Sequence, residues 1–185
     1  MSDRVSADRV SRRSLAWVVG IVVVIAAVGV AAGLLWHSLL HVPHGVVVSH
    51  QWFPDPWEPG ERDLFDATGW YVVIAVVAGL VLGIGAAVLS RAPELWTLAA
   101  VLVGSLIAAW LMRAVGLHGA PPDPHAAARH AADGTRLSGT FGRPGAAAFV
   151  TWPLAAVLPV GLVFLLVPGR ASAPAERTAQ ARPGR

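Results

Sequence analysis

The stretch "WYVVIAVVAGLVLGIGAAVLSRAPELWTLAAVLVGSLIAAWLM", Trp70–Met112, contains two long apolar runs joined by the short segment "SRAPE". Neither run, Trp70–Leu89 or Leu95–Met112, contains an acidic or basic residue. A helix rising 1.5 Å per residue needs about 20 apolar residues to cross a hydrocarbon core of roughly 30 Å. Because the connecting segment is so short, the stretch predicts an antiparallel hairpin of two transmembrane helices.

Two further runs of the same kind flank this hairpin, at Leu15–Trp36 and Ala146–Val167. Only 14% of the 185 residues are charged, whereas a soluble domain has about 25%. Long runs without alternation favour helices, since lipid forces backbone groups to pair within one segment. The sequence therefore predicts an all-α integral membrane protein with four transmembrane helices at about 15–36, 70–89, 95–116 and 146–167.

The four predicted helices divide the chain into a membrane domain, two terminal segments and the loops between the helices. We expect a cytoplasmic N-terminal segment at 1–14, a membrane domain at 15–168 and a disordered Ala/Pro/Arg-rich cytoplasmic tail at 169–185. Two outer loops, 37–69 and 117–145, complete the membrane domain. Within them "VVVSH" and "TRLSGTF" have β-branched or alternating character, which favours a short β pairing over the helix ends.

Arginines provide every cationic side chain except histidine, because the chain has no lysine. Nine arginines and four acidic residues fall in residues 1–14, the 90–94 turn and the tail, a balance of +5. The two loops on the opposite side hold four arginines and seven acidic residues, a balance of −3. This distribution predicts a multi-pass plasma-membrane protein with both termini in the cytoplasm, and it argues against nucleic-acid binding despite the basic pI.

Tryptophans mark the ends of the apolar runs, where indoles commonly form an interfacial belt. The belt predicted here consists of Trp17, Trp36, Trp70, Trp96 and Trp152.

The segment "RDLFDATGWY" precedes the second apolar run and has two interpretations. Asp66 or Thr68 can cap the helix through a side-chain oxygen, Gly69 follows as a further structural candidate, and Trp70 and Tyr71 mark the headgroup level. Alternatively, Asp63 and Asp66 form a carboxylate pair for acid–base chemistry, although the surrounding charged residues predict a solvated loop. Capping is the favoured interpretation.

Gly79 and Gly83 form a GxxxG pattern in the second helix, and small residues let membrane helices approach closely. The pattern fits either packing within the chain or self-association with a second copy or a membrane-protein partner. Sequence alone leaves both open.

All seven histidines lie in or beside the predicted outer loops. His37 and His41 are four residues apart, a spacing compatible with metal ligation, and His44 and His50 follow. No complete ligand motif is present and there is no cysteine, so histidines acting as interfacial polar residues are the favoured interpretation and no cofactor is expected.

Three quoted segments together resemble a known family: "LFDATGWYVVIAVVAGLVLGIGAAVL"; "WTLAAVLVGSLIAAWLMRAVGL" with "PPDP" after it; and "ADGTRLSGTFGRPGAAAFVTWPLAAVL". The family is the actinobacterial membrane proteins called domain of unknown function 2567. The resemblance covers most of residues 30–168, with Trp152–Pro153 among its markers, but "DATGW" replaces the expected compact Asp-Gly-aromatic sequence. It implies four spans and supplies no reaction or ligand.

No nucleophile elbow, Walker loop or dinucleotide fingerprint occurs in the chain. We therefore expect a non-enzymatic accessory or scaffold subunit of a membrane complex. The alternatives are a transport-associated protein that binds a metal or small ligand through its histidine-rich loops, and a membrane enzyme that uses Asp63 and Asp66, with His50 as a further candidate.

Overall fold

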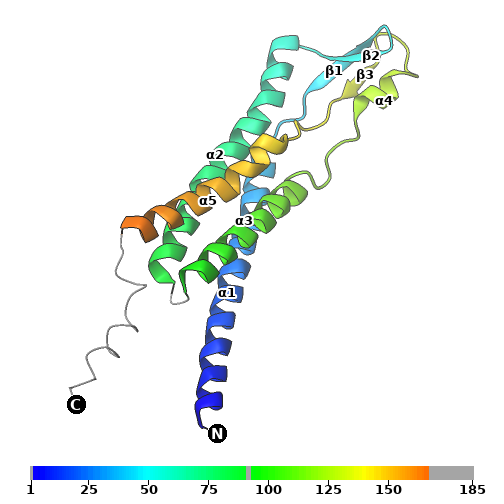
Figure 1. Ribbon diagram of the computed structural model, residues 1–185. Helices are drawn as coiled ribbons and strands as arrows, with labels where there is room; N and C mark the ends of the chain where they lie inside the picture. Colours follow the sequence, from blue (N-terminus) through cyan, green and yellow to red (C-terminus); the bar gives the residue numbers. More distant parts are fainter. Residues whose placement is uncertain (1, 91–92, 167–185) are drawn as a thin grey trace, which may run out of the picture.

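The protein is described by a computed structural model that places residues 2–90 and 93–166 (Figure 1). In chain order its elements are α1 (Ser2–Leu39), β1 (His44–Val48), β2 (Gln51–Pro54), α2 (Trp57–Leu89), α3 (Glu94–Gly116), α4 (Pro124–Ala128), β3 (Arg136–Ser138) and α5 (Ala146–Leu166). Stretches of α1, α2, α3 and α5 are long and apolar enough to cross a membrane, which confirms the four predicted spans. The predicted disordered tail lies outside the described residues.

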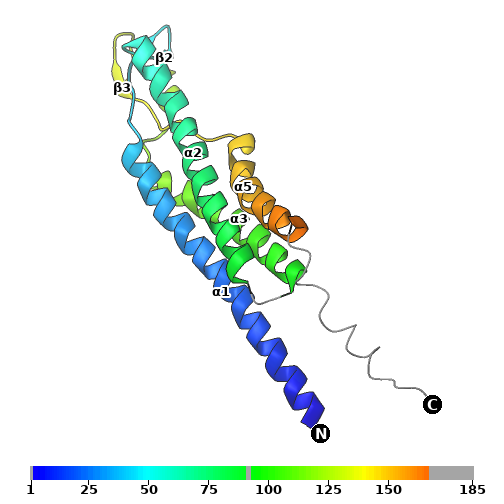
Figure 2. The same cartoon turned by 90° about the vertical axis from the view of Figure 1, so that its left-hand side faces the viewer.

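The four long helices form a bundle in which consecutive long helices alternate in direction, so that α1 packs chiefly on α3, which runs parallel to it, and α2 chiefly on α5, also in parallel. Helices α3 and α5 join these two pairs, whereas α1 and α2 touch less extensively. Figure 1 shows the three strands and α4 together at one end of the bundle, which we call the cap. The start of α1, the end of α2 and the end of α5 lie at the opposite end, which we call the arginine-rich end (Figures 1 and 2).

Helix α2 begins at Trp57 rather than at Trp70, so the predicted boundary is wrong. Hydropathy detects only the part of a helix that is apolar, and the polar residues before Trp70 continue the same helix toward the cap. Pro56 occupies the N-cap position without a side-chain hydrogen bond. Asp66 and Thr68 therefore lie inside the helix, and the prediction that either caps it is also wrong.

Glycines set the distance between the packed helices. A Cβ atom at Gly29 of α1 would lie 2.6 Å from the Ala108 Cα of α3. A Cβ atom at Gly79 of α2 would lie 2.9 Å from the Ala155 Cβ of α5. Gly83 is closer still, since a Cβ atom there would press against the Ala156 carbonyl oxygen of α5. Both members of the GxxxG pattern therefore pack within the chain, which is the first of the two interpretations.

Two of the five tryptophans assigned to an interfacial belt are instead in the core. Trp36 and Trp152 are 0% exposed, whereas Trp17, Trp70 and Trp96 are exposed near the ends of their spans. Trp36 does not need interfacial water because its Nε1 donates a buried hydrogen bond to the Ala67 carbonyl oxygen at 2.8 Å.

Trp36 also contacts Tyr71 edge to face, with ring centroids 5.3 Å apart, and we call these two residues the core aromatic pair. The Tyr71 hydroxyl donates to the Ala109 carbonyl oxygen at 3.1 Å. The pair thereby joins α1, α2 and α3 in the half of the bundle nearest the cap.

Candidate functional site

The cap is built on a three-stranded antiparallel sheet of order β2–β1–β3. Val46 in the central strand faces Phe53 of β2 and Arg136 of β3. The pairing predicted between the two loops is therefore confirmed. The sheet gains β2 as well, because Gln51–Pro54 continues from a tight hairpin into a strand.

Trp52 organises the interior of the cap. Its Nε1 donates to the Leu137 carbonyl oxygen at 3.1 Å, and its ring contacts His125 of α4 edge to face at 5.8 Å. Val47 and Ala128 complete this small buried cluster. Gly45 is required beside it, since a Cβ atom there would overlap the indole of Trp52.

The hairpin between β1 and β2 turns at Ser49 and His50, which both have positive φ angles of 51° and 62°. A two-residue turn with both φ values positive matches the twist of the flanking strands. Asp133 approaches this turn from the other loop, with its Oδ1 3.4 Å from the His50 backbone nitrogen. The two outer loops thus support each other at the tip of the cap.

His37 connects the cap to the helix ends. Its Nδ1 lies 2.9 Å from the Gly116 carbonyl oxygen at the end of α3. Its ring also packs edge to face on Phe141, a buried residue of the segment after β3, at 5.8 Å. The cap is therefore attached to the bundle by side-chain contacts as well as by the chain itself.

An exposed aromatic pair lies on the cap side of α2. Phe53 of β2 and Trp57 at the first turn of α2 have ring centroids 6.3 Å apart, and they are 37% and 56% exposed. Both precede the apolar span, which begins at Phe65. The sequence analysis missed this pair, which we call the cap aromatic pair, although "WFPDPW" carried the signal of aromatic residues among turn-forming prolines.

The four histidines considered as metal ligands do not come together. His37 is engaged with Gly116 and Phe141, while His41, His44 and His50 are exposed along the linker, β1 and the hairpin turn. Across residues 2–90 and 93–166, no three His, Asp or Glu side chains form a group that could hold a metal ion. The arrangement therefore offers no assembled metal centre among these residues.

The residues singled out around the start of the second span have separate positions. Asp63 is half-buried and Asp66 is exposed, both within α2. Thr68 is half-buried, and Gly69 has open space where a Cβ atom would lie. Pro153 is buried in the interior of α5, next to Trp152.

Comparison with known proteins returned no matching family model, no matching curated protein and no matching solved structure. The resemblance to domain of unknown function 2567 stays a prediction.

Proposed function

We propose that this chain is a non-enzymatic accessory or scaffold subunit of a plasma-membrane complex, and that it binds its partner through the cap. The observation that carries the proposal is the cap aromatic pair, Phe53 and Trp57, exposed outside the apolar span. Exposed aromatic side chains beyond the membrane are costly in water and are enriched at protein interaction sites.

The cap aromatic pair is carried by regular secondary structure, which suits a docking surface. Phe53 belongs to a paired strand, and Trp57 belongs to a helix that continues without a break through the span to Leu89. Both side chains therefore sit on regular elements, which lowers the entropy lost when a partner binds. Asp55 and Glu58 are exposed beside them, so a partner with a basic rim would complement the site.

The proposed location is the plasma membrane, with the arginine-rich end in the cytoplasm and the cap outside. The balances of +5 and −3 on the two sides of the sequence support this orientation, because short cytoplasmic segments are enriched in arginine. Gly79 and Gly83 already pack against α5, so we propose that the partner contacts the cap rather than the GxxxG pattern.

The test is the size of the complex extracted from native membranes with a mild detergent. We expect blue-native electrophoresis to give a discrete assembly larger than the monomer, and a Phe53→Ser/Trp57→Ser variant to migrate as the free chain. Val48→Ser is the matched control, since Val48 is an exposed apolar residue of the same sheet outside the pair. A wild-type chain that is monomeric, or a double variant that retains the assembly, would refute the proposal.

A further inference from the structure

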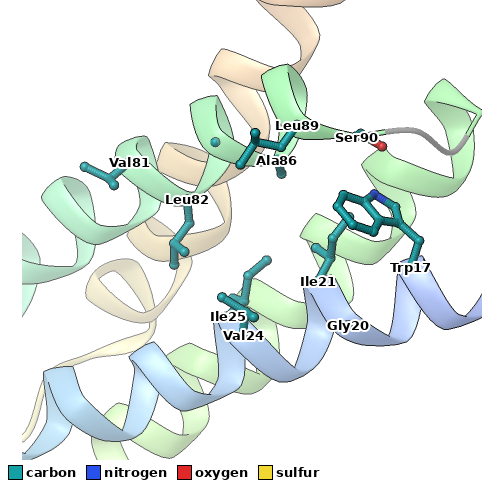
Figure 3. A pocket seen from close by; sticks show the side chains of 11 residues that line it. Trp17, Gly20, Ile21, Val24, Ile25, Val81, Leu82, Ala86, Leu89 and Ser90 are labelled. Carbon is teal, nitrogen blue, oxygen red and sulfur yellow. The ribbon is translucent and has the colours of Figure 1, made fainter.

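A groove opens between α1 and α2 in the half of the bundle nearest the arginine-rich end (Figure 3). Its volume is about 470 Å³, and it is lined by Trp17, Ile21 and Ile25 of α1 and by Leu82, Gly85 and Leu89 of α2. Apart from Ser90 at its edge, the lining is apolar. We call this feature the α1–α2 groove.

The groove exists because α1 and α2 are held together at one end only. Toward the cap, the core aromatic pair and the Trp36–Ala67 hydrogen bond close the two helices on each other. Toward the arginine-rich end, Gly20 and Gly85 both face open space, with no atom within 4 Å of a Cβ built at either position. The groove therefore ends blindly in the interior of the span.

The length of the groove identifies the kind of apolar group that fits. The lining of α1 runs from Trp17 to Ile25, which at 1.5 Å per residue corresponds to about 12 Å. One leaflet contributes roughly 15 Å of a 30 Å hydrocarbon core. Ile25 lies close to the middle of the Leu15–Leu39 span, so the groove extends over a single leaflet. A transmembrane helix of a partner would need a contact surface along the whole thickness of the bilayer, whereas one acyl chain needs a groove along one leaflet only.

The mouth of the groove carries the features of a headgroup region. Trp17 projects from α1 toward the end of α2 at the opening, and its indole is 38% exposed (Figure 3). Arg12 and Arg13 precede it by five and four residues in the same helix. Arginines beside a membrane surface attract anionic lipids, and an interfacial indole pairs an apolar ring with a polar N–H.

We propose that the α1–α2 groove binds an acyl chain of an anionic phospholipid from the leaflet at the arginine-rich end. The chain lies between Ile21, Ile25 and Leu82, and the phosphate-bearing headgroup remains at the mouth, near Trp17. Arg12 and Arg13, which precede Trp17 in the sequence, supply positive charge on the same side of the span. The bound lipid fills the gap that the two helices leave between them. This inference does not depend on the function proposed for the cap.

The test measures lipids retained by the full-length purified chain. Native mass spectrometry is recorded after equilibration with equal amounts of phosphatidylglycerol and phosphatidylcholine that carry the same acyl chains. We expect one phosphatidylglycerol to be retained in preference, by roughly tenfold, because each arginine near the surface favours an anionic lipid.

Three variants separate the groove from the remaining lipid-exposed surface. Gly20→Leu/Gly85→Leu places side chains in the open space of the groove and should lower phosphatidylglycerol retention by about tenfold or more. Gly161→Leu is the control, because Gly161 of α5 has equally open surroundings outside the groove and should retain lipid as the wild type does. Arg12→Gln/Arg13→Gln leaves the groove intact and should remove the preference for phosphatidylglycerol over phosphatidylcholine.

Several results would overturn the inference. Equal retention of both lipids by the wild type would indicate an ordinary lipid shell. Unchanged retention in the Gly20→Leu/Gly85→Leu variant would place the lipid elsewhere. A wild-type dimer that this variant converts to monomer would assign the groove to a second copy of the chain. If the Gly20→Leu/Gly85→Leu variant does not fold, the single Gly85→Leu variant replaces it in the same measurement, and unchanged retention there would equally place the lipid elsewhere.

Discussion

The contact between α2 and α5 can be tested with two glycines that lie two residues apart in α2. At Gly83, an added Cβ atom would press against the Ala156 carbonyl and lie 2.8 Å from the Pro159 Cγ. At Gly85, an added Cβ atom would meet nothing within 4 Å. The two substitutions to alanine thus make the same chemical change in opposite surroundings.

The magnitude follows from the packing at each site. Overfilling a packed interface costs about 1–3 kcal/mol, so Gly83→Ala should lower the free energy of unfolding by this amount. Replacing glycine by alanine in an unobstructed helix is favourable by about 0.5–1 kcal/mol, so Gly85→Ala should raise it slightly. The Gly85→Ala variant should therefore be about 1.5–4 kcal/mol more stable than the Gly83→Ala variant.

The assay is reversible unfolding of the full chain in mixed micelles by titration with sodium dodecyl sulfate, followed by circular dichroism. Both variants are measured beside the wild type under one set of conditions, so that errors in extrapolation cancel. Equal stability of Gly83→Ala and Gly85→Ala would show that α2 does not pack on α5 through its glycines. The helix arrangement described above would then be wrong.

Three further predictions concern the core and the cap. Trp36→Phe should lower the free energy of unfolding by about 1 kcal/mol more than Trp152→Phe in the same assay. The reason is that Trp36 Nε1 donates to the Ala67 carbonyl oxygen, whereas Trp152 Nε1 is buried without a partner among the described residues. Equal losses of stability in the two variants would contradict this. Met112→Ala should lower the free energy of unfolding by about 2–5 kcal/mol, since Met112 is fully buried between the helices. A loss no larger than that of a substitution at an exposed position would contradict this packing. His50→Gly should slow hydrogen exchange in β1 and β2, because a non-glycine residue at φ 62° costs about 1–2 kcal/mol; faster exchange would argue against the turn.

The membrane spans were predictable because a bilayer imposes a simple requirement on the chain. Each span needs a continuous apolar run of fixed length, and all four runs are visible in the sequence. The short pairing of β1 with β3 was also predictable, from β-branched residues in one loop and alternation in the other. The spans and the pairing both depend on local pattern, which a single sequence records directly.

The failures came from features that depend on contacts between distant residues. The residues from Glu58 to Gly69 resemble a loop because they carry no continuous apolar run, yet they form the first turns of α2 and extend it ahead of the span that begins at Phe65. Trp36 resembles an interfacial tryptophan at the end of its run, but Tyr71 and Ala67 provide a buried partner for its ring and its N–H. Neither partner is identifiable without the packing of α1 on α2.

The candidate sites show the same contrast between local sequence pattern and contacts between distant residues. Spacing alone suggested His37 and His41 as metal ligands, whereas the fold engages His37 with Gly116 and leaves His41 exposed. The cap aromatic pair and the α1–α2 groove were not predicted, because each forms between residues of two elements that only the fold brings together.

Orientation in the membrane is the claim on which the proposed partner and the proposed leaflet location both depend. The chain has no cysteine, so single introduced cysteines report accessibility without background. Val48→Cys places a thiol on the exposed side of the cap, and Ser11→Cys places one ahead of the first span. A membrane-impermeant maleimide should label Val48→Cys in intact cells and Ser11→Cys only after permeabilisation. Labelling of Ser11→Cys in intact cells, with Val48→Cys protected, would contradict the account.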